Sequence, residues 1–269
     1  MPRTIKKTKM KQLEQQLAEQ EQLLQEVRTK QGNNDSSLRF GQSCVSASSI
    51  AEQYFCEKKV ELEFIHGKVE TEPKRLGTEG HETLLADTIK VKRAEIFEQI
   101  WSGEPIIAHE MLLLSRYNDL ILVGRPDAVV FSRTKPLMLF EYKFSRSTTP
   151  YSGYHVQAKV YGKILEGMGF DTSKLHYVLA VVPPSLKDDE ALFQKILNAS
   201  VKNGPQEARL EMKEASVYIH PYRSGDADQD ITWASDFWKG AREAIPTMNK
   251  NKCRSCEYKD NCNFIEINK

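Results

Sequence analysis

The N-terminal segment carries a hydrophobic pattern with the period of a helix. Its apolar side chains recur at spacings of three and four residues and share one row with a single polar residue: Met10, Leu13, Leu17, Gln20, Leu24 and Val27. This heptad seam predicts a helix that ends at the linker 32–37. Because short isolated helices are marginal in water, we interpret residues 1–35 as a solvated N-terminal helical extension. A short coiled coil and a helix that docks a partner protein are the alternatives.

The next segment predicts two further helices. A capping-box pattern at Ser49 and Glu52 indicates a helix that continues through Phe55 and carries Cys56. The second helix is expected from about Glu79 to Trp101, with a histidine in its first turn.

The middle of the chain changes to long apolar runs. Residues 106–114, 120–131 and 137–144 are such runs, and the segments 118–119 and 132–136 separate them as turns. We interpret them as three strands of an antiparallel meander.

The remainder of the chain alternates between helix and strand patterns. Helices are expected at 154–168, 188–200 and 231–245, and strands at 175–182 and 208–220. This order predicts an α/β domain over residues 36–269, in which helices cover a central sheet.

Composition limits the classes of protein. The 269 residues are 40% hydrophobic and carry a net charge of only +1, so any grip on nucleic acid must come from a local patch. No run of about 18 apolar residues indicates a membrane span, and no apolar N-terminal signal is present. These features predict a cytoplasmic protein, in which five cysteines do not form a disulfide framework.

Two short motifs in the apolar runs suggest catalytic chemistry. Asp127 ends the motif Gly-Arg-Pro-Asp, and Glu141 and Lys143 belong to a Glu-Tyr-Lys triplet. Residues two apart in a strand point to the same face, and Asp127 can lie across from them. Carboxylates bind hard divalent ions, and a nearby cation assists phosphodiester hydrolysis. The alternative is a cross-strand ion pair on a solvated face.

Three further side chains are candidates for the same site. Gln157 and Tyr161 are four residues apart and share one helical face, where they could orient a phosphate or the lysine. An ordinary helix surface is the alternative. His81 could complete a carboxylate site and favour Mn²⁺ beside Mg²⁺, although a structural or solvated histidine is the alternative.

The cysteines near the C-terminus indicate a metal or cluster site. Cys253 and Cys256 have the spacing of two thiolates on one metal or cluster, and Cys262 follows. The fourth ligand must come from Cys44 or Cys56, and we prefer Cys56 because it belongs to a predicted helix. An iron–sulfur cluster is favoured over zinc, which usually takes two close cysteine pairs; three unligated cysteines are the remaining alternative.

In this order the motifs resemble the PD-(D/E)XK nucleases. Among these, the chain is similar to RecB-like nucleases with an iron–sulfur staple, which include the CRISPR-associated adaptation exonuclease and the nuclease parts of helicase–nuclease proteins. The resemblance covers roughly residues 44–265. It implies a restriction-endonuclease-like core, in which a central mixed β-sheet is flanked by helices, with an iron–sulfur-stapled helical part.

The resemblance also implies a role for each candidate residue. The Mn²⁺ or Mg²⁺ ligands would be His81, Asp127, Glu141 and the carbonyl of Tyr142. Lys143 would position or activate the attacking water, and Gln157 and Tyr161 would form the downstream helix motif. The ligands of a [4Fe–4S] cluster would be Cys56, Cys253, Cys256 and Cys262.

The expected function is that of a metal-dependent DNA nuclease. The resemblance favours an exonuclease acting on single-stranded DNA or DNA ends, in CRISPR spacer acquisition or in DNA recombination and repair. The chain has no Gly-x-x-x-x-Gly-Lys-Ser/Thr phosphate loop, so a motor would be a separate chain. A non-catalytic iron–sulfur or zinc protein that binds DNA or assembles with partners is the alternative.

Overall fold

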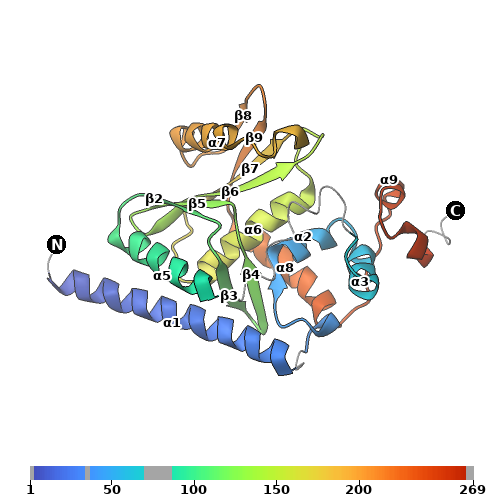
Figure 1. Cartoon of the computed structure of the whole chain (residues 1–269), viewed down its shortest axis with the longest axis horizontal. Coiled ribbons are helices and arrows are strands. Elements are labelled where there is room, and N and C mark those ends of the chain that lie inside the picture. The colour runs from blue at the N-terminus through green and yellow to red at the C-terminus, as the bar shows by residue number, and fades with distance from the viewer. Residues whose placement is uncertain (1–2, 34–36, 70–86, 265–269) are drawn as a thin grey trace.

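A six-stranded mixed sheet forms the centre of the fold in a computed structural model that describes residues 3–33, 37–69 and 87–264 (Figure 1). The strand order is β2 (Ile106–His109), β5 (Ala128–Ser132), β6 (Lys135–Phe144), β7 (His176–Val182), β9 (Ser216–Pro221) and β8 (Ala208–Glu211). Strands β6 and β7 are parallel, and the other neighbours are antiparallel. The parallel pair needs a crossover connection, which helix α6 (Ser152–Gly167) supplies.

Helices cover both faces of this sheet. Val160 and Ile164 of α6 share one buried cluster with Leu139 and Leu179, while α7 (Glu190–Asn203) packs on the opposite face. Strand β7 is consequently buried along nearly its whole length and carries a continuous apolar run, as expected for a strand covered on both sides. The fold is therefore a mixed sheet flanked by helices, which confirms the expected restriction-endonuclease-like core.

A smaller sheet lies beside the first. Its order is β1 (Val45–Ser46), β4 (Leu120–Gly124) and β3 (Leu113–Tyr117), with β1 parallel and β3 antiparallel to β4. The expected three-strand meander is thus wrong, because the runs 106–114 and 120–131 each divide between the two sheets. The second division falls at Pro126, which has no N–H to donate to a ladder. The first falls near Glu110, whose φ of 47° ends the extended backbone.

The hairpin β8–β9 corrects another expectation. The segment 208–220 was predicted to be one strand, but it turns at 212–215 and pairs with itself. The helices α6 and α7 and the strand β7 confirm the elements expected at 154–168, 188–200 and 175–182. The helix expected at 231–245 begins and ends earlier, as α8 (Ser224–Trp238).

The helices before the sheet also differ from the prediction. Helix α2 (Ala47–Gln53) begins earlier than expected, because the hydroxyl of Ser46 caps it by accepting a 3.0 Å hydrogen bond from the Ser49 N–H. It ends before Cys56, which immediately precedes α3 (Glu57–His66). Helix α5 (Asp87–Ser102) is the described part of the helix expected at 79–101.

Helix α1 (Arg3–Asn33) is not a solvated tail. It lies beside α5 and β3 (Figure 1), and Leu24 and Val27 of its heptad seam are buried. The amide of Gln20 donates a 2.7 Å hydrogen bond to the carbonyl of Leu114 on β3, an edge strand of the small sheet. The seam therefore packs within the chain and covers a strand edge that would otherwise be unpaired. Of Met10, only the helical backbone is described.

The C-terminal helix α9 (Lys250–Arg254) lies at the other end of the molecule from the start of α1 (Figure 1). Within the described ranges, the search for a helix long and apolar enough to cross a membrane finds none.

Candidate active site and cysteine pocket

The candidate site forms where β5 and β6 separate. The two strands pair from Ser132 and Lys135 as far as Ala128 and Phe140, and Asp127 stands immediately before β5. Beyond that point β6 continues without β5, and Asp127 Oδ2 accepts a 2.6 Å hydrogen bond from the Tyr142 N–H. The aspartate side chain therefore replaces a strand neighbour and is held next to Glu141.

The predicted residues on β6 and α6 form one hydrogen-bonded network. Lys143 Nζ lies 2.8 Å from Glu141 Oε1 and donates a 2.7 Å hydrogen bond to Gln157 Oε1. The Gln157 amide donates to Glu141 Oε1 at 2.8 Å and to the Tyr161 hydroxyl at 2.7 Å. Tyr161 in turn donates to the carbonyl of Arg125 at 3.3 Å. The structure thus brings the sequence-predicted side chains to one place.

Burial distinguishes a catalytic site from the alternatives of a solvated ion pair and an ordinary helix surface. Glu141 is 6% exposed, Gln157 7% and Tyr161 4%, so neither a solvated ion pair nor an ordinary helix surface describes them. The Tyr161 ring packs against the backbone of Gly124, where a Cβ atom would lie only 2.4 Å from ring carbon Cε1. The Tyr161 ring can therefore occupy this position only because the residue at the end of β4 is a glycine.

Burial disfavours the ionised forms of both carboxylates in the site. Burial, and after it the charge of Glu141, raise the pKa of Asp127 to about 8 against the opposing Tyr142 N–H and Lys143. Burial also raises the pKa of Glu141, although Lys143 opposes this. Burial disfavours the charged form of Lys143, but the Glu141 carboxylate outweighs it and raises the lysine pKa. A bound cation would favour the ionised carboxylates.

The remaining predicted ligands have different outcomes. The Tyr142 side chain points to the α7 side, where its hydroxyl donates to the Phe193 carbonyl at 3.3 Å, while its backbone N–H faces Asp127. In a strand, the N–H and C=O of one residue point to the same side, so its carbonyl also faces Asp127. His81 lies outside the described residues. Within the described parts, no three His, Cys, Asp or Glu side chains are close enough together to hold one metal ion.

Two neighbours of the site were not predicted. Lys143 Nζ lies 5.0 Å from the ring centroid of Tyr154. Tyr154 precedes Gln157 by three residues and shares its helix face, so helical periodicity could have identified Tyr154 as a neighbour of the site. The Glu110 N–H donates a 3.1 Å hydrogen bond to the Asp127 carbonyl, and its charge raises the Asp127 pKa. Glu110 sits inside an apolar run, and no sequence signal marked it.

Four of the five cysteines gather at one place, beside the start of α3 and the helix α9. One small pocket is lined by four thiols, those of Cys56, Cys253, Cys256 and Cys262. Cys44 lies elsewhere, packed against the cluster of Leu24 and Leu112, where burial raises its thiol pKa to about 11. Of the two upstream candidates, the structure therefore brings Cys56 to the C-terminal cysteines.

Protein contacts hold the C-terminal segment against α2 and α3. Lys252 Nζ donates to the carbonyls of Tyr54 and Phe55 at 3.0 and 3.2 Å. The buried hydroxyl of Tyr258 donates to the Gly67 carbonyl at 2.7 Å and accepts from the Val69 N–H at 3.1 Å. These contacts fix the backbone on which three of the four thiols stand.

A mixed sheet flanked by helices, with an Asp-Glu-Lys set where two strands separate, defines the class as a nuclease with a restriction-endonuclease-like fold. The model of the PD-(D/E)XK nuclease superfamily matches residues 7–263, and the chain belongs to this superfamily.

Similarity to curated relatives is confined to segments. The chain is 33% identical over 51 residues to mitochondrial exonuclease V of Candida tropicalis, covering 19% of this chain and 8% of that protein. It is 27% identical over 106 residues to mitochondrial exonuclease V of Candida albicans, covering 36% of this chain and 17% of that protein. The chain thus matches less than a fifth of the length of these relatives. The similarity is consistent with a RecB-like nuclease.

Among solved structures, the chain is similar to the crystal structure of SSO0001. The TM-score is 0.43 at 15% sequence identity, and the match covers 82% of this chain and 86% of that chain.

Proposed function

We propose that this nuclease is a metal-dependent exonuclease that degrades single-stranded DNA or DNA ends, with Mn²⁺ or Mg²⁺ bound at Asp127 and Glu141. The observation that carries the proposal is the pair of carboxylates beside Lys143, of which Glu141 is buried and Asp127 half-buried. Carboxylate oxygens are the donors that hard divalent cations prefer. Burial and the charge of Glu141 raise the pKa of Asp127 to about 8, so a bound cation would stabilise its ionised form, and the donor set fits a cation.

Each residue of the network has a distinct task in this proposal. A bound divalent ion would neutralise the scissile phosphate and lower the pKa of an attacking water. The Lys143 ammonium has three N–H donors, of which two point to Glu141 and Gln157. The third is left to donate to the attacking water or to a phosphate oxygen. Gln157 and Tyr161 hold this lysine and Glu141 in place through their mutual hydrogen bonds.

The proposed ligand set extends beyond the two carboxylates. The Tyr142 carbonyl, on the strand side that faces Asp127, and His81 are proposed as further donors to the ion. The products would be a 3′-hydroxyl and a 5′-phosphate. Asp127, Glu141 and Lys143 are all retained, which supports catalysis over a purely DNA-binding role.

We also propose that Cys56, Cys253, Cys256 and Cys262 hold a [4Fe–4S] cluster. All four thiols line one pocket, and cluster ligands are thiolates. The ammonium groups of Lys59 and Lys252 lie beside this pocket, 4.8 and 5.0 Å from the Phe55 ring centroid. Burial raises the pKa of the Cys253 and Cys256 thiols, and the charge of Lys59 opposes this at Cys256. An absorption band at about 400 nm with about four irons per chain would support the cluster, whereas zinc without iron would refute it.

The proposed activity suits two biological settings, CRISPR spacer acquisition and DNA recombination or repair. A protein partner at helix α1 would have to bind its outer polar face, because the apolar seam packs within the chain.

The test of the nuclease is cleavage of end-labelled linear and circular single-stranded DNA with Mn²⁺. The wild type should release nucleotides from linear DNA and spare the circle, which has no end. Asp127→Asn and Lys143→Ala should lower the rate by at least about a hundredfold while leaving the protein folded. Wild-type rates in both folded variants would show that the site is wrong, and rapid cleavage of the circle would show that the enzyme is not an exonuclease.

A further inference from the structure

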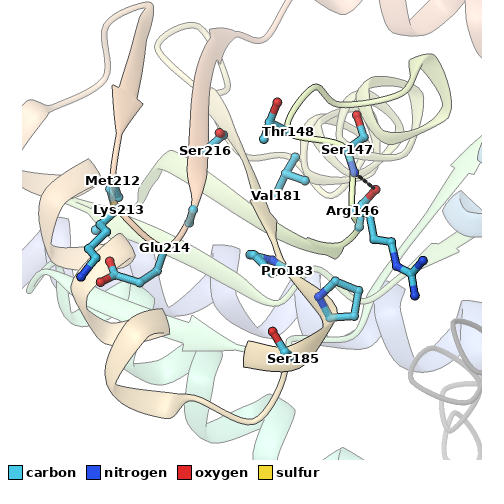
Figure 2. A pocket seen from close by; sticks show the side chains of 13 residues that line it. Arg146, Ser147, Thr148, Val181, Pro183, Ser185, Met212, Lys213, Glu214 and Ser216 are labelled. Atoms are coloured by element: carbon cyan, nitrogen blue, oxygen red, sulfur yellow. Dashed lines mark hydrogen bonds between the residues drawn. The ribbon is translucent and has the colours of Figure 1, made fainter.

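Another pocket, with a volume of about 510 Å³, opens at the carboxyl ends of the parallel strands β6 and β7 (Figure 2). Three segments enclose it: the loop 145–148 after β6, residues 183–185 after β7, and the turn 212–216 between β8 and β9. The carboxyl ends of neighbouring parallel strands are a common ligand position in α/β sheets. The volume lies within the range of small-ligand sites.

This pocket shares a sheet face with Lys143. Val181 lines the pocket and pairs with Lys143 across β6 and β7, and Ser216 pairs with Val181 across β7 and β9. Leu179, two residues before Val181, lies in the core that α6 covers, so Val181 faces the α6 side as Lys143 does. Since adjacent strands are about 4.8 Å apart, the row from Lys143 through Val181 to Ser216 spans only about 10 Å.

The rim carries positive charge that is not paired within the part of the chain that the structure describes. Arg146 and Lys213 lie on opposite sides of the pocket (Figure 2), both are exposed, and neither forms an ion pair with any other described residue. The one acid among the lining residues, Glu214, lies 3.4 Å from Lys195 Nζ, which balances its charge. The pocket is therefore suited to an anionic group.

Hydroxyl groups supply neutral donors inside the rim. The side chains of Thr148, Ser185 and Ser216 line the pocket and make no hydrogen bond to the rest of the described chain. Cations at the rim combined with free hydroxyls are the usual partners of a sugar–phosphate backbone.

The loop that forms one wall is fixed in position. The Ser147 N–H donates to Ser145 Oγ at 3.0 Å, and the Thr149 N–H donates to Ser147 Oγ at 3.2 Å. From the β9 side, the Tyr218 hydroxyl donates to the Thr148 carbonyl at 2.9 Å. These bonds hold the wall without a ligand, so little ordering is required on binding.

We infer that this pocket is a substrate subsite for the nucleotide next to the scissile phosphate on a single DNA strand. The phosphate of that nucleotide lies between Arg146 and Lys213, and its sugar and base lie against Val181 and Pro183. This inference rests on the proposed nuclease function and adds the position of the flanking strand. Because cations and hydroxyls contact the backbone, the subsite serves all base sequences alike.

The test compares the double variant Arg146→Ala/Lys213→Ala with Lys202→Ala, which removes an exposed lysine of α7 that does not line the pocket. With Mn²⁺ and single-stranded DNA, the double variant should raise KM about tenfold and leave kcat within about twofold. Its binding in EDTA should show a shallower salt dependence, by about 0.7 in log–log slope for one lost phosphate contact. Arg146→Lys should recover part of the loss, and Lys202→Ala should match the wild type.

Binding in EDTA separates this inference from the nuclease proposal. If the wild type cuts DNA but the double variant keeps the wild-type KM and salt slope, the subsite is wrong and the nuclease stands. If the wild type does not cut DNA, the nuclease proposal fails. In that case the pocket is supported as a DNA site if the double variant binds DNA more weakly than the wild type and Lys202→Ala does not. The subsite is overturned if the double variant and Lys202→Ala bind DNA equally well.

Discussion

Replacing Gly124 by alanine is the sharpest test of how the fold builds the site. The added methyl group would lie 2.4 Å from Cε1 and 2.5 Å from Cδ1 of Tyr161. Ordinary contacts between carbon atoms are about 3.5–4.0 Å, so the ring must retreat by at least about 1 Å. The ring has no free space, because Tyr161 is 4% exposed and the neighbouring Ile164 and Leu165 are 0% exposed.

The cost has two parts. Forcing an extra methyl into a filled core costs about 1–3 kcal/mol. Moving Tyr161 also strains its hydrogen bonds to Gln157 and to the Arg125 carbonyl, each worth about 1 kcal/mol. The expected loss is about 2–4 kcal/mol, which lowers Tm by about 4–16 °C in a chain of this size. Because Gln157 also holds Lys143, kcat should fall by about tenfold to a hundredfold.

The assay is a thermal melt together with kcat on single-stranded DNA. The matched control is Gly225→Ala in α8, because no atom lies within 4 Å of the added methyl there and alanine favours a helix. A double-mutant cycle with Tyr161→Ala should show that Gly124→Ala costs far less once the ring is removed. The reasoning is refuted if Gly124→Ala melts and cuts like the wild type, or if its cost is the same with and without the ring.

Three further outcomes are expected. Arg242→Ala should lower the free energy of unfolding by about 3–5 kcal/mol, because it leaves the buried Glu57 carboxylate without the two hydrogen bonds of 2.5 and 2.7 Å that Arg242 donates. Denaturant unfolding should show a smaller loss in the double variant Arg242→Ala/Glu57→Gln, and an equal loss would contradict this. EDTA should abolish cleavage, and Mn²⁺ added back should restore it; full activity in EDTA would exclude a dissociable metal. Burial, with the nearby charges of His220 and Lys159, lowers the pKa of His155 to about 4. Between about pH 6.5 and pH 4 the unfolded chain then binds more protons than the folded chain, so stability should fall as the pH is lowered through this range. Tm measured against pH should fall less in His155→Gln than in the wild type, and an equal fall in both would contradict this.

Strand and helix periodicity were sufficient to predict which of the candidate side chains share a face. Glu141 and Lys143 had to share a face because they are two residues apart, and Gln157 and Tyr161 had to share one because they are four apart. Pairing across the strands could not be predicted in the same way. The divisions at Glu110 and Pro126 fall inside runs that are apolar on both sides of the division, so hydropathy does not show that the two halves of a run belong to different sheets.

The sequence pattern also could not identify which distant segment each buried face packs against. The heptad seam identified the buried face of α1 correctly, but a pattern on one helix does not say whether its partner is another chain, water or, as here, the edge strand β3. The choice of Cys56 over Cys44 likewise depended on contacts that are distant in sequence. The prediction that Cys56 belongs to a helix was wrong, because α2 ends before it, yet the cysteine does line the C-terminal pocket.

The hydrogen bond from the Tyr142 N–H to Asp127 ties folding to reactivity. One carboxylate oxygen, Oδ2, completes the main-chain bonding of β6, and Oδ1 accepts no hydrogen bond from any other described residue. The direction of Oδ1 is therefore set when the sheet forms, and an arriving ion does not have to order this side chain. The entropy of fixing the ligand is spent during folding, which lowers the cost of binding. An asparagine at this position can keep the strand intact while losing the charge, whereas an alanine would also leave a main-chain donor unpaired.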